Sequence, residues 1–144
     1  MKKVSYIIIS LFSLLFFSCE IETSSNGKLD GNWQLQSCDT LSTGGICDMK
    51  RSGIYWAFEN HLLQIRNIEK GEKILFRFER ASNTLTIHSP HRFESRYETV
   101  PVEDVDQLIP FGIQGTEDTF QMEKLSGSIL VLSNQQLRLH FRKY

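Results

Sequence analysis

From residue 30 onward, apolar and polar side chains alternate along short runs of the chain. The run Ile-Tyr-Trp-Ala-Phe-Glu at 54–59 is the clearest example, and 74–79 and 137–142 have the same period. A period of two places alternate side chains on opposite faces of a β-strand. Here one face is apolar and aromatic and the other is polar, which is typical of antiparallel strands with one face in a core. We therefore predict an all-β protein.

The runs follow one another closely and are separated by turn-forming residues. Turn signals lie at 60–61, 70–72, 82–83, 89–90 and 133–134, and they leave about nine strand-sized runs. A sheet of that size removes its exposed edges most simply by closing on itself. We expect an up-and-down antiparallel barrel of eight or nine strands over residues 29–144, with a long loop or short helix near 101–115. The pattern leaves a two-sheet sandwich open as the alternative.

The first nineteen residues have the pattern of an export signal. Lys2 and Lys3 precede the mostly apolar stretch 4–17, which is short for a membrane span and ends at a small residue, Ser18. Phe-Phe-Ser-Cys at 16–19 resembles the signal of bacterial lipoproteins. This resemblance implies that residues 1–18 are a signal peptide, that Cys19 is acylated (with palmitate among the chains), and that 19–28 form a tether.

The same resemblance implies a bacterial outer membrane location, with the protein held by its N-terminal lipid. Glu20 and Glu22 lie directly after the acylated cysteine. They partly resemble the acidic signal that sends some lipoproteins to the cell surface. The cell surface and the periplasmic face both stay open.

The chain has three cysteines, an odd number for an exported protein. If lipid occupies Cys19, Cys38 and Cys47 are left as a pair, separated by eight residues rich in turn formers. In an oxidising compartment we expect a disulfide between them. The spacing is poor for a metal site, because no second pair of ligands accompanies it.

Charge and motifs exclude several classes of function. The 16 basic and 17 acidic residues give a net charge of −1, with no basic cluster for nucleic acid. His88 and His91 have no third metal ligand nearby, and the acidic residues of 103–106 do not have EF-hand spacing. No nucleophile elbow, phosphate loop or zinc-protease motif occurs in the chain. We therefore expect no enzyme activity, no catalytic residues, no metal and no cofactor.

Two parts of the chain resemble a known family. Gly31-Asn32-Trp33 opens the first run in the manner of the lipocalin signature, and the runs 120–125, 129–132 and 137–144 look like the last three strands of lipocalin-like lipoproteins of some Gram-negative bacteria. The resemblance implies an eight-stranded barrel in which Trp33 packs across the closed end. It also implies a cation stacked on that tryptophan, for which Arg138, Arg142 and Lys143 are the candidates.

The inward-facing set that we infer is bulky, which favours a largely filled core and a small, flat or single-chain ligand. Gln64 and Ser95 could place polar groups near an opening, and Tyr55, Arg96 and His88 are further polar candidates. The ligand-binding candidates are the large inward aromatic residues: Trp33, Trp56, Phe58, Phe76, Phe78, Phe93, Tyr97 and Phe120.

Two functions remain open at this point. We expect a lipid-anchored envelope protein that binds or carries a small hydrophobic ligand in its barrel without catalysis. In the alternative, the filled barrel is a scaffold, and the loops 38–47 and 101–115 bind an envelope protein or inhibit an enzyme. The apolar contacts would then come from the second loop: Leu108, Ile109, Phe111 and Ile113.

Overall fold

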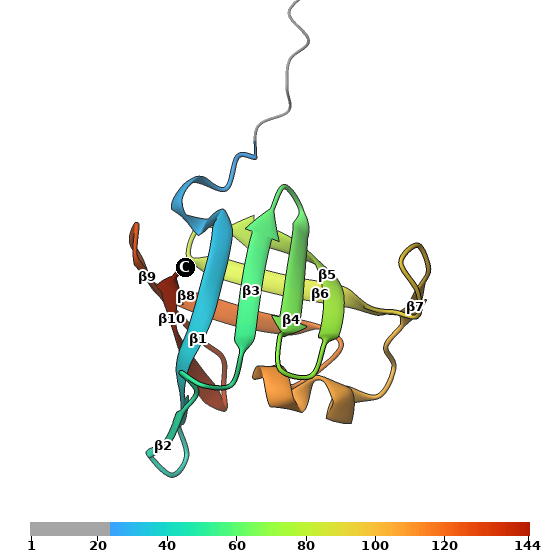
Figure 1. The fold of residues 1–144 in the computed structure, drawn as a ribbon. Helices are drawn as coiled ribbons and strands as arrows, with labels where there is room; N and C mark the ends of the chain where they lie inside the picture. Colours follow the sequence, from blue (N-terminus) through green and yellow to red (C-terminus); the bar gives the residue numbers. More distant parts are fainter. Residues whose placement is uncertain (1–23) are drawn as a thin grey trace, which may run out of the picture.

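The computed structural model describes residues 24–144, which form a closed antiparallel β-barrel (Figure 1). Hydrogen bonds join neighbouring strands around the barrel, and pairing of the last strand with the first closes it. The all-β barrel prediction is therefore confirmed, with eight strands in the barrel itself. These are β1 (Gly31–Thr40), β3 (Ile54–Glu59), β4 (Leu62–Asn67), β5 (Glu72–Ala81), β6 (Thr84–Phe93), β8 (Asp118–Leu125), β9 (Ile129–Ser133) and β10 (Leu137–Lys143).

The signal peptide, Cys19 and the first part of the expected tether lie outside the described residues. Between residues 24 and 144, no helix is long and apolar enough to cross a membrane. The end of the expected tether is attached to the barrel. Asn26 donates hydrogen bonds to the carbonyl oxygen of Asn60 and to the carboxylate of Asp30, both at 2.8 Å, and Arg80 donates to the carbonyl oxygen of Asn26.

Two short strands and three single helical turns supplement the barrel. β2 (Gly45–Asp48) pairs with the second half of β1, and β7 (Thr99–Pro101) pairs with the end of β6. The sequence pattern did not predict β2, because turn-forming residues surround it. One turn of 3-10 helix, η2 (Gly27–Leu29), precedes β1. The short helix expected near 101–115 is present as two such turns, η3 (Val105–Gln107) and η4 (Ile109–Phe111).

The predicted turn at Ser89–Pro90 is wrong, because β6 continues through it. Leu75 lies opposite His91 and Arg77 lies opposite His88, so β6 carries one additional residue at this point. Ser89 lies at this irregularity and has a φ of 54°. A β-bulge of this kind bends a strand without ending it.

The alternation of Phe93, Ser95 and Tyr97 with charged residues also predicts a strand over residues 93–97 with these three facing inward, and this prediction is wrong. β6 ends at Phe93, and a loop follows in which the Glu94 N–H donates to the carbonyl oxygen of Glu98 at 3.0 Å. Alternate residues in this segment are charged, and no further strand buries its other face. As a result Tyr97 is 85% exposed and Phe93 is 38% exposed, so neither faces the core as predicted.

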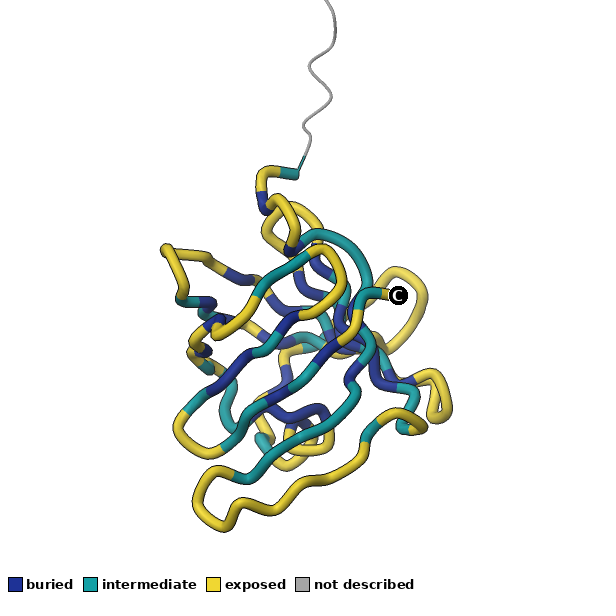
Figure 2. The backbone as a smooth tube through the Cα atoms, turned by 90° about the vertical axis from the view of Figure 1, so that its left-hand side faces the viewer, coloured by how far each residue is buried: buried dark blue, intermediate teal, exposed yellow. Residues whose placement is uncertain are grey.

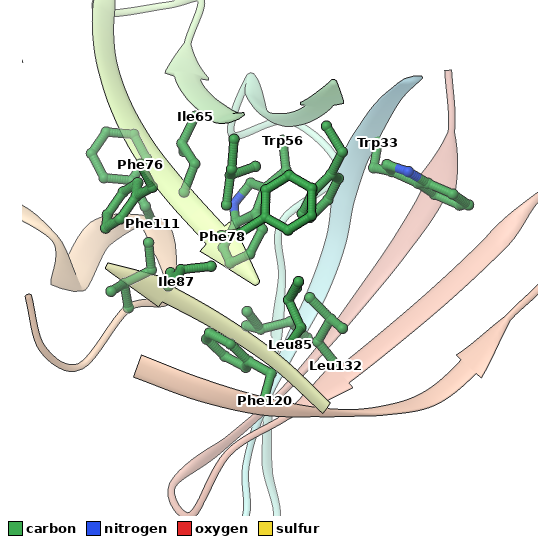
Figure 3. Close-up of a cluster of buried hydrophobic side chains, with 14 of the residues drawn as sticks. Trp33, Trp56, Ile65, Phe76, Phe78, Leu85, Ile87, Phe111, Phe120 and Leu132 are labelled. Atoms are coloured by element: carbon green, nitrogen blue, oxygen red, sulfur yellow. The ribbon is translucent and has the colours of Figure 1, made fainter. Parts of the chain in front are cut away.

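The core is a single cluster of apolar side chains inside the barrel (Figures 2 and 3). In the run 129–132 the sequence pattern predicts that Val131 faces inward, and this is wrong: Leu130 and Leu132 are buried instead. An uninterrupted apolar run does not show which of its side chains face the core. Leu137 is only partly buried against the cluster. The largest fully buried side chains are Trp33, Trp56, Phe58, Phe76, Phe120 and Phe141.

Trp33 closes one end of the barrel, as the lipocalin resemblance implied. Its Nε1 donates a hydrogen bond of 2.8 Å to the carbonyl oxygen of Leu29, and Lys143 Nζ lies 4.4 Å from its ring centroid. Of the three candidate cations, Lys143 is thus the one that stacks on the tryptophan. Arg138 instead forms a two-point ion pair with Glu123, at 2.8 and 3.0 Å. This pair lowers the pKa of the Glu123 carboxyl below its usual range.

Candidate binding site at the barrel mouth

Aromatic rings occupy the barrel interior. The Trp56 ring lies 5.9 Å from Phe120 and 5.0 Å from Phe141, centroid to centroid, and Phe58 lies 5.3 Å from Phe78. These distances are typical of packed aromatic pairs. Six of the eight ligand-binding candidates are core residues: Trp33, Trp56, Phe58, Phe76, Phe78 and Phe120. An interior filled in this way holds the barrel together and leaves a ligand little room.

The segment with η3 and η4 packs into the end of the barrel opposite Trp33. Figure 3 shows Phe111 at the far side of the cluster from Trp33, beside Phe76. Leu108, Phe111 and Ile113 are all buried in the core cluster, so they are not the exposed apolar contacts that a protein-binding loop needs. Only Ile109 among the four candidates stays substantially exposed, at 48%.

Above this plug lies a partly enclosed cavity of about 700 Å³. Its apolar lining includes two core residues, Ile74 and Phe111, and two more exposed residues, Phe93 and Pro110. The volume lies within the range of small-molecule sites, which combine apolar surface with a few placed polar groups. The lining comes from β4, the β4–β5 turn, the start of β5, the end of β6 with its loop to β7, and η3 and η4: Gln64, Lys70, Gly71, Glu72, Lys73, Ile74, Arg92, Phe93, Ser95, Arg96, Gln107, Pro110 and Phe111.

The cavity is positively charged, although the chain as a whole has a net charge of −1. Four basic side chains line it, with a single acidic one, Glu72. Arg92 forms an ion pair with Glu94, with Nη2 2.6 Å from the carboxylate. Among residues 24–144, the other three basic side chains have no carboxylate partner within ion-pair distance: Lys70, Lys73 and Arg96.

Some of the polar residues singled out from the sequence meet at this mouth. Gln64, Ser95 and Arg96 all line the cavity, as does Phe93, one of the eight aromatic candidates. Tyr55 does not: it packs edge-on against Tyr144, with 5.2 Å between ring centroids. His88 lies 3.9 Å from Glu79 and lines a separate, shallower depression.

Sequence reasoning missed the basic residues Lys70, Lys73 and Arg92. Lys70 belongs to the predicted turn at 70–72 and Lys73 directly follows it. A lysine at such a place is normally a solvated surface residue, so the sequence gives no indication of a binding role. Arg92 follows the unrecognised bulge of β6. The bulge brings it directly opposite the buried Ile74 on β5, at the mouth of the barrel.

Cys38 and Cys47 lie directly opposite each other in the β1–β2 pair, and the structure contains them as free thiols. Burial raises the pKa of the Cys38 thiol, and the nearby Cys47 and Asp39 raise it further. Cys47 is exposed, with its sulfur 3.6 Å from that of Met49. The expected disulfide therefore remains a prediction, for which the register is suitable.

The other clusters considered from the sequence have structural partners. Asp104 caps η3, with its carboxylate accepting a hydrogen bond from the Asp106 N–H at 3.0 Å. His88 and His91 both contact Ser89, through its hydroxyl and its carbonyl oxygen respectively. In the described part of the chain, no group of three or more His, Cys, Asp or Glu side chains is placed to hold a metal ion.

Two solved structures share this fold. A lipocalin-like protein from Bacteroides uniformis ATCC 8492 is 21% identical, with a TM-score of 0.64 over 82% of this chain and 100% of its own. An uncharacterized protein from Bacteroides eggerthii DSM 20697 is 17% identical, with a TM-score of 0.61 over 81% and 99% of the two chains. No curated protein matches the sequence. The family model described as a lipocalin-like domain matches residues 14–144, which include all of the described residues 24–144. The chain therefore belongs to the family of lipocalin-like domains.

Proposed function

We propose that this protein is a non-catalytic binding protein that holds a small, partly apolar molecule at the mouth of its barrel. The observation that carries the proposal is the cavity of about 700 Å³, whose lining includes the apolar residues Ile74, Phe93, Pro110 and Phe111. Phe93, which is 38% exposed, and the exposed Pro110 also line the cavity, so an apolar ligand would remove exposed hydrophobic surface from water. The ligand class is the one expected from the sequence, but its place is the mouth of the barrel.

The mouth is favoured over the interior on physical grounds. A ligand inside the barrel would have to displace rings that already pack at 5.0–5.9 Å from one another around Trp56. Opening such a core forfeits the dispersion contacts of several large side chains. The mouth cavity needs no such rearrangement, because its space is already formed.

The fluorescent probe N-phenyl-1-naphthylamine tests this proposal. It is small, apolar and uncharged, and its emission rises in an apolar site. We expect saturable binding to the purified full chain. Ser95→Trp places a large ring in the cavity and should weaken binding about tenfold, roughly the loss of 1.4 kcal/mol.

Two control variants locate the bound probe. Ser128→Trp adds the same ring at an exposed residue of the β8–β9 turn that does not line the cavity, and binding should stay unchanged. Phe120→Leu enlarges the interior and should also leave binding unchanged. Tighter binding by Phe120→Leu together with normal binding by Ser95→Trp would place the ligand inside the barrel and overturn the proposal.

We further propose that the protein is anchored in the bacterial outer membrane through lipid on Cys19. The support is the sequence alone: a basic start, an apolar stretch and a small residue before the cysteine. More than one acyl chain is needed for a stable anchor, and a lipoprotein cysteine carries several.

Mass spectrometry of the protein isolated from Gram-negative membranes tests the anchor. We expect a chain that begins at Cys19 and carries the mass of a diacylglyceryl group and further acyl chains. Cys19→Ser should lack that mass and appear in the soluble fraction or as an uncleaved precursor. An unmodified Cys19 in the isolated protein would refute the proposal.

A further inference from the structure

We infer that the mouth cavity takes an amphipathic anion, a molecule with an apolar body and a single carboxylate, sulfonate or similar group. This inference rests on the proposed function and adds the charge of the ligand to it. Its basis is the uneven distribution of charge. The protein is slightly negative overall, yet the cavity has four basic side chains against one acidic one.

The basic groups are available to a ligand. Lys70, Lys73 and Arg96 have no carboxylate partner within ion-pair distance among residues 24–144. The remaining one, Arg92, is partnered by Glu94 through Nη2, which leaves other N–H groups of its guanidinium without an acidic partner. Four basic groups with Glu72 and Glu94 as acidic neighbours repel one another, and an anion relieves that repulsion.

The basic groups come from three separate segments that line one cavity together with apolar residues. Lys70 and Lys73 lie on the β4–β5 turn and at the start of β5, Arg92 lies at the end of β6, and Arg96 lies in the loop before β7. The apolar lining residues are Ile74, Phe93, Pro110 and Phe111. A ligand with its apolar part against these residues would have its polar end among the basic side chains. Low-dielectric walls on one side strengthen the attraction there.

A second feature agrees with a charged head group near the rim. Gln64, Ser95 and Gln107 also line the cavity, and their amide and hydroxyl groups can donate hydrogen bonds to an anionic oxygen. Glu72 is the single lining group that would repel such an anion. The cavity therefore distinguishes between ligands of the same shape and opposite charge.

A matched pair of fluorescent probes tests the inference on the full chain. 8-Anilino-1-naphthalenesulfonate is the N-phenyl-1-naphthylamine skeleton with one added sulfonate, so the two probes differ essentially in charge. We expect the sulfonate probe to bind about tenfold more tightly than the neutral one at low salt. Raising the sodium chloride concentration from 50 to 500 mM should reduce that advantage to less than threefold, because exposed charges are screened.

Substitutions in the lining identify the groups responsible. Lys73→Gln and Arg96→Gln should each weaken sulfonate binding about threefold to tenfold and leave the neutral probe unaffected. Glu72→Gln should have the opposite effect and tighten sulfonate binding. Lys50→Gln is the matched control: it removes the same charge from an exposed residue that does not line the cavity, and should change neither affinity.

The outcomes separate the inference from the function that it rests on. If neither probe binds, the proposed function fails and the inference fails with it. If both bind equally, or if Lys73→Gln and Arg96→Gln weaken both probes alike, the cavity binds small molecules but the inference about charge is wrong. Preferential sulfonate binding that is lost with these two substitutions and kept with Lys50→Gln supports it.

Discussion

At the scale of single residues, the closed end of the barrel depends on a glycine, a tryptophan and a lysine. Gly31 has a φ of 110°, and a Cβ built on it would lie 3.0 Å from Cε of Lys143. The absence of a side chain at Gly31 thus lets Lys143 reach across to the face of Trp33. The Lys143 ammonium also donates to the carbonyl oxygens of Lys28 and Asp30, which holds the chain that precedes β1 against β10.

The two tryptophans offer a direct test of these interactions, because both are fully buried. Trp33 has a hydrogen bond and a stacked cation, whereas Nε1 of Trp56 has no acceptor among residues 24–144. Trp33→Phe and Trp56→Phe remove the same atoms, so the free energy of unfolding should fall further for Trp33→Phe, by about 1–3 kcal/mol. Urea denaturation measures the difference. Equal losses would mean that packing alone accounts for both residues.

The sequence reduced the candidates for the cation stacked on Trp33 to three residues, but it did not identify which of them stacks. The motif at 31–33 marks Trp33, and three basic residues near the end of the chain qualify as its partner. The choice depends on the β1–β10 register, which places Lys143 opposite Trp33 and Arg138 opposite Asp39. These two strands lie at opposite ends of the described chain, and closure of the whole sheet sets their register. A local sequence pattern therefore does not determine which residues of the two strands pair.

At the scale of elements, β2 lies outside the barrel, attached to the second half of β1. β2 is exposed along its whole length and pairs only with β1, and Figure 1 shows it projecting below the barrel. Its attachment therefore rests on a few backbone hydrogen bonds and on the side chains that face β1. A covalent link between Cys38 and Cys47 would fix this hairpin in register.

We expect the protein to form the Cys38–Cys47 disulfide under oxidising conditions. Closing this short loop should raise the free energy of unfolding by about 2–3 kcal/mol, so dithiothreitol should lower the melting temperature of the wild type. The double variant with Cys38→Ser and Cys47→Ser should be insensitive to dithiothreitol. In the reduced protein, iodoacetamide should modify Cys47 before Cys38, since Cys38 is partly buried and its thiol pKa is raised. Identical melting temperatures with and without dithiothreitol would contradict the prediction.

Strands with strict alternation could be predicted well, and those with irregularities could not. The runs around Trp56 and Phe76 alternate cleanly, and their inward faces match the prediction. β6 carries a bulge at Ser89, and the Ser-Pro pair there has the same appearance in sequence as a turn. This wrong turn led to a second wrong prediction, a separate strand after residue 90. It also meant that the position of Arg92 at the mouth of the barrel was not predicted.

At the scale of the whole molecule, the barrel is closed at one end by Trp33 and plugged at the other by η3, η4 and the residues that follow. The apolar residues of 101–115 could be identified from the sequence, but their role could not. An apolar loop at a barrel end has the same composition whether it covers the opening, binds a partner or fills the core. The structure shows that it fills the core with Leu108, Phe111 and Ile113 and contributes part of the lining of the mouth cavity.

Removal of the Phe111 ring tests this dual role, because the ring belongs to both the core and the cavity. Phe111→Ala should lower the free energy of unfolding by about 3–5 kcal/mol, as is usual for a buried phenylalanine. It should also deepen the mouth cavity toward Phe76 and tighten binding of N-phenyl-1-naphthylamine in molecules that remain folded. Phe111→Leu, a smaller change, should shift both quantities in the same directions by less.

Ile109→Ala is the matched control for that experiment. Ile109 belongs to the same helical turn, but it is half exposed and does not line the cavity. The free energy of unfolding of the Ile109→Ala variant and its affinity for the probe should stay close to those of the wild type. If Phe111→Ala and Ile109→Ala were equally stable, the loop would only rest on the barrel as a cover. A large loss for Phe111→Ala without any change in probe binding would mean that the plug stabilises the barrel but is not part of the binding site.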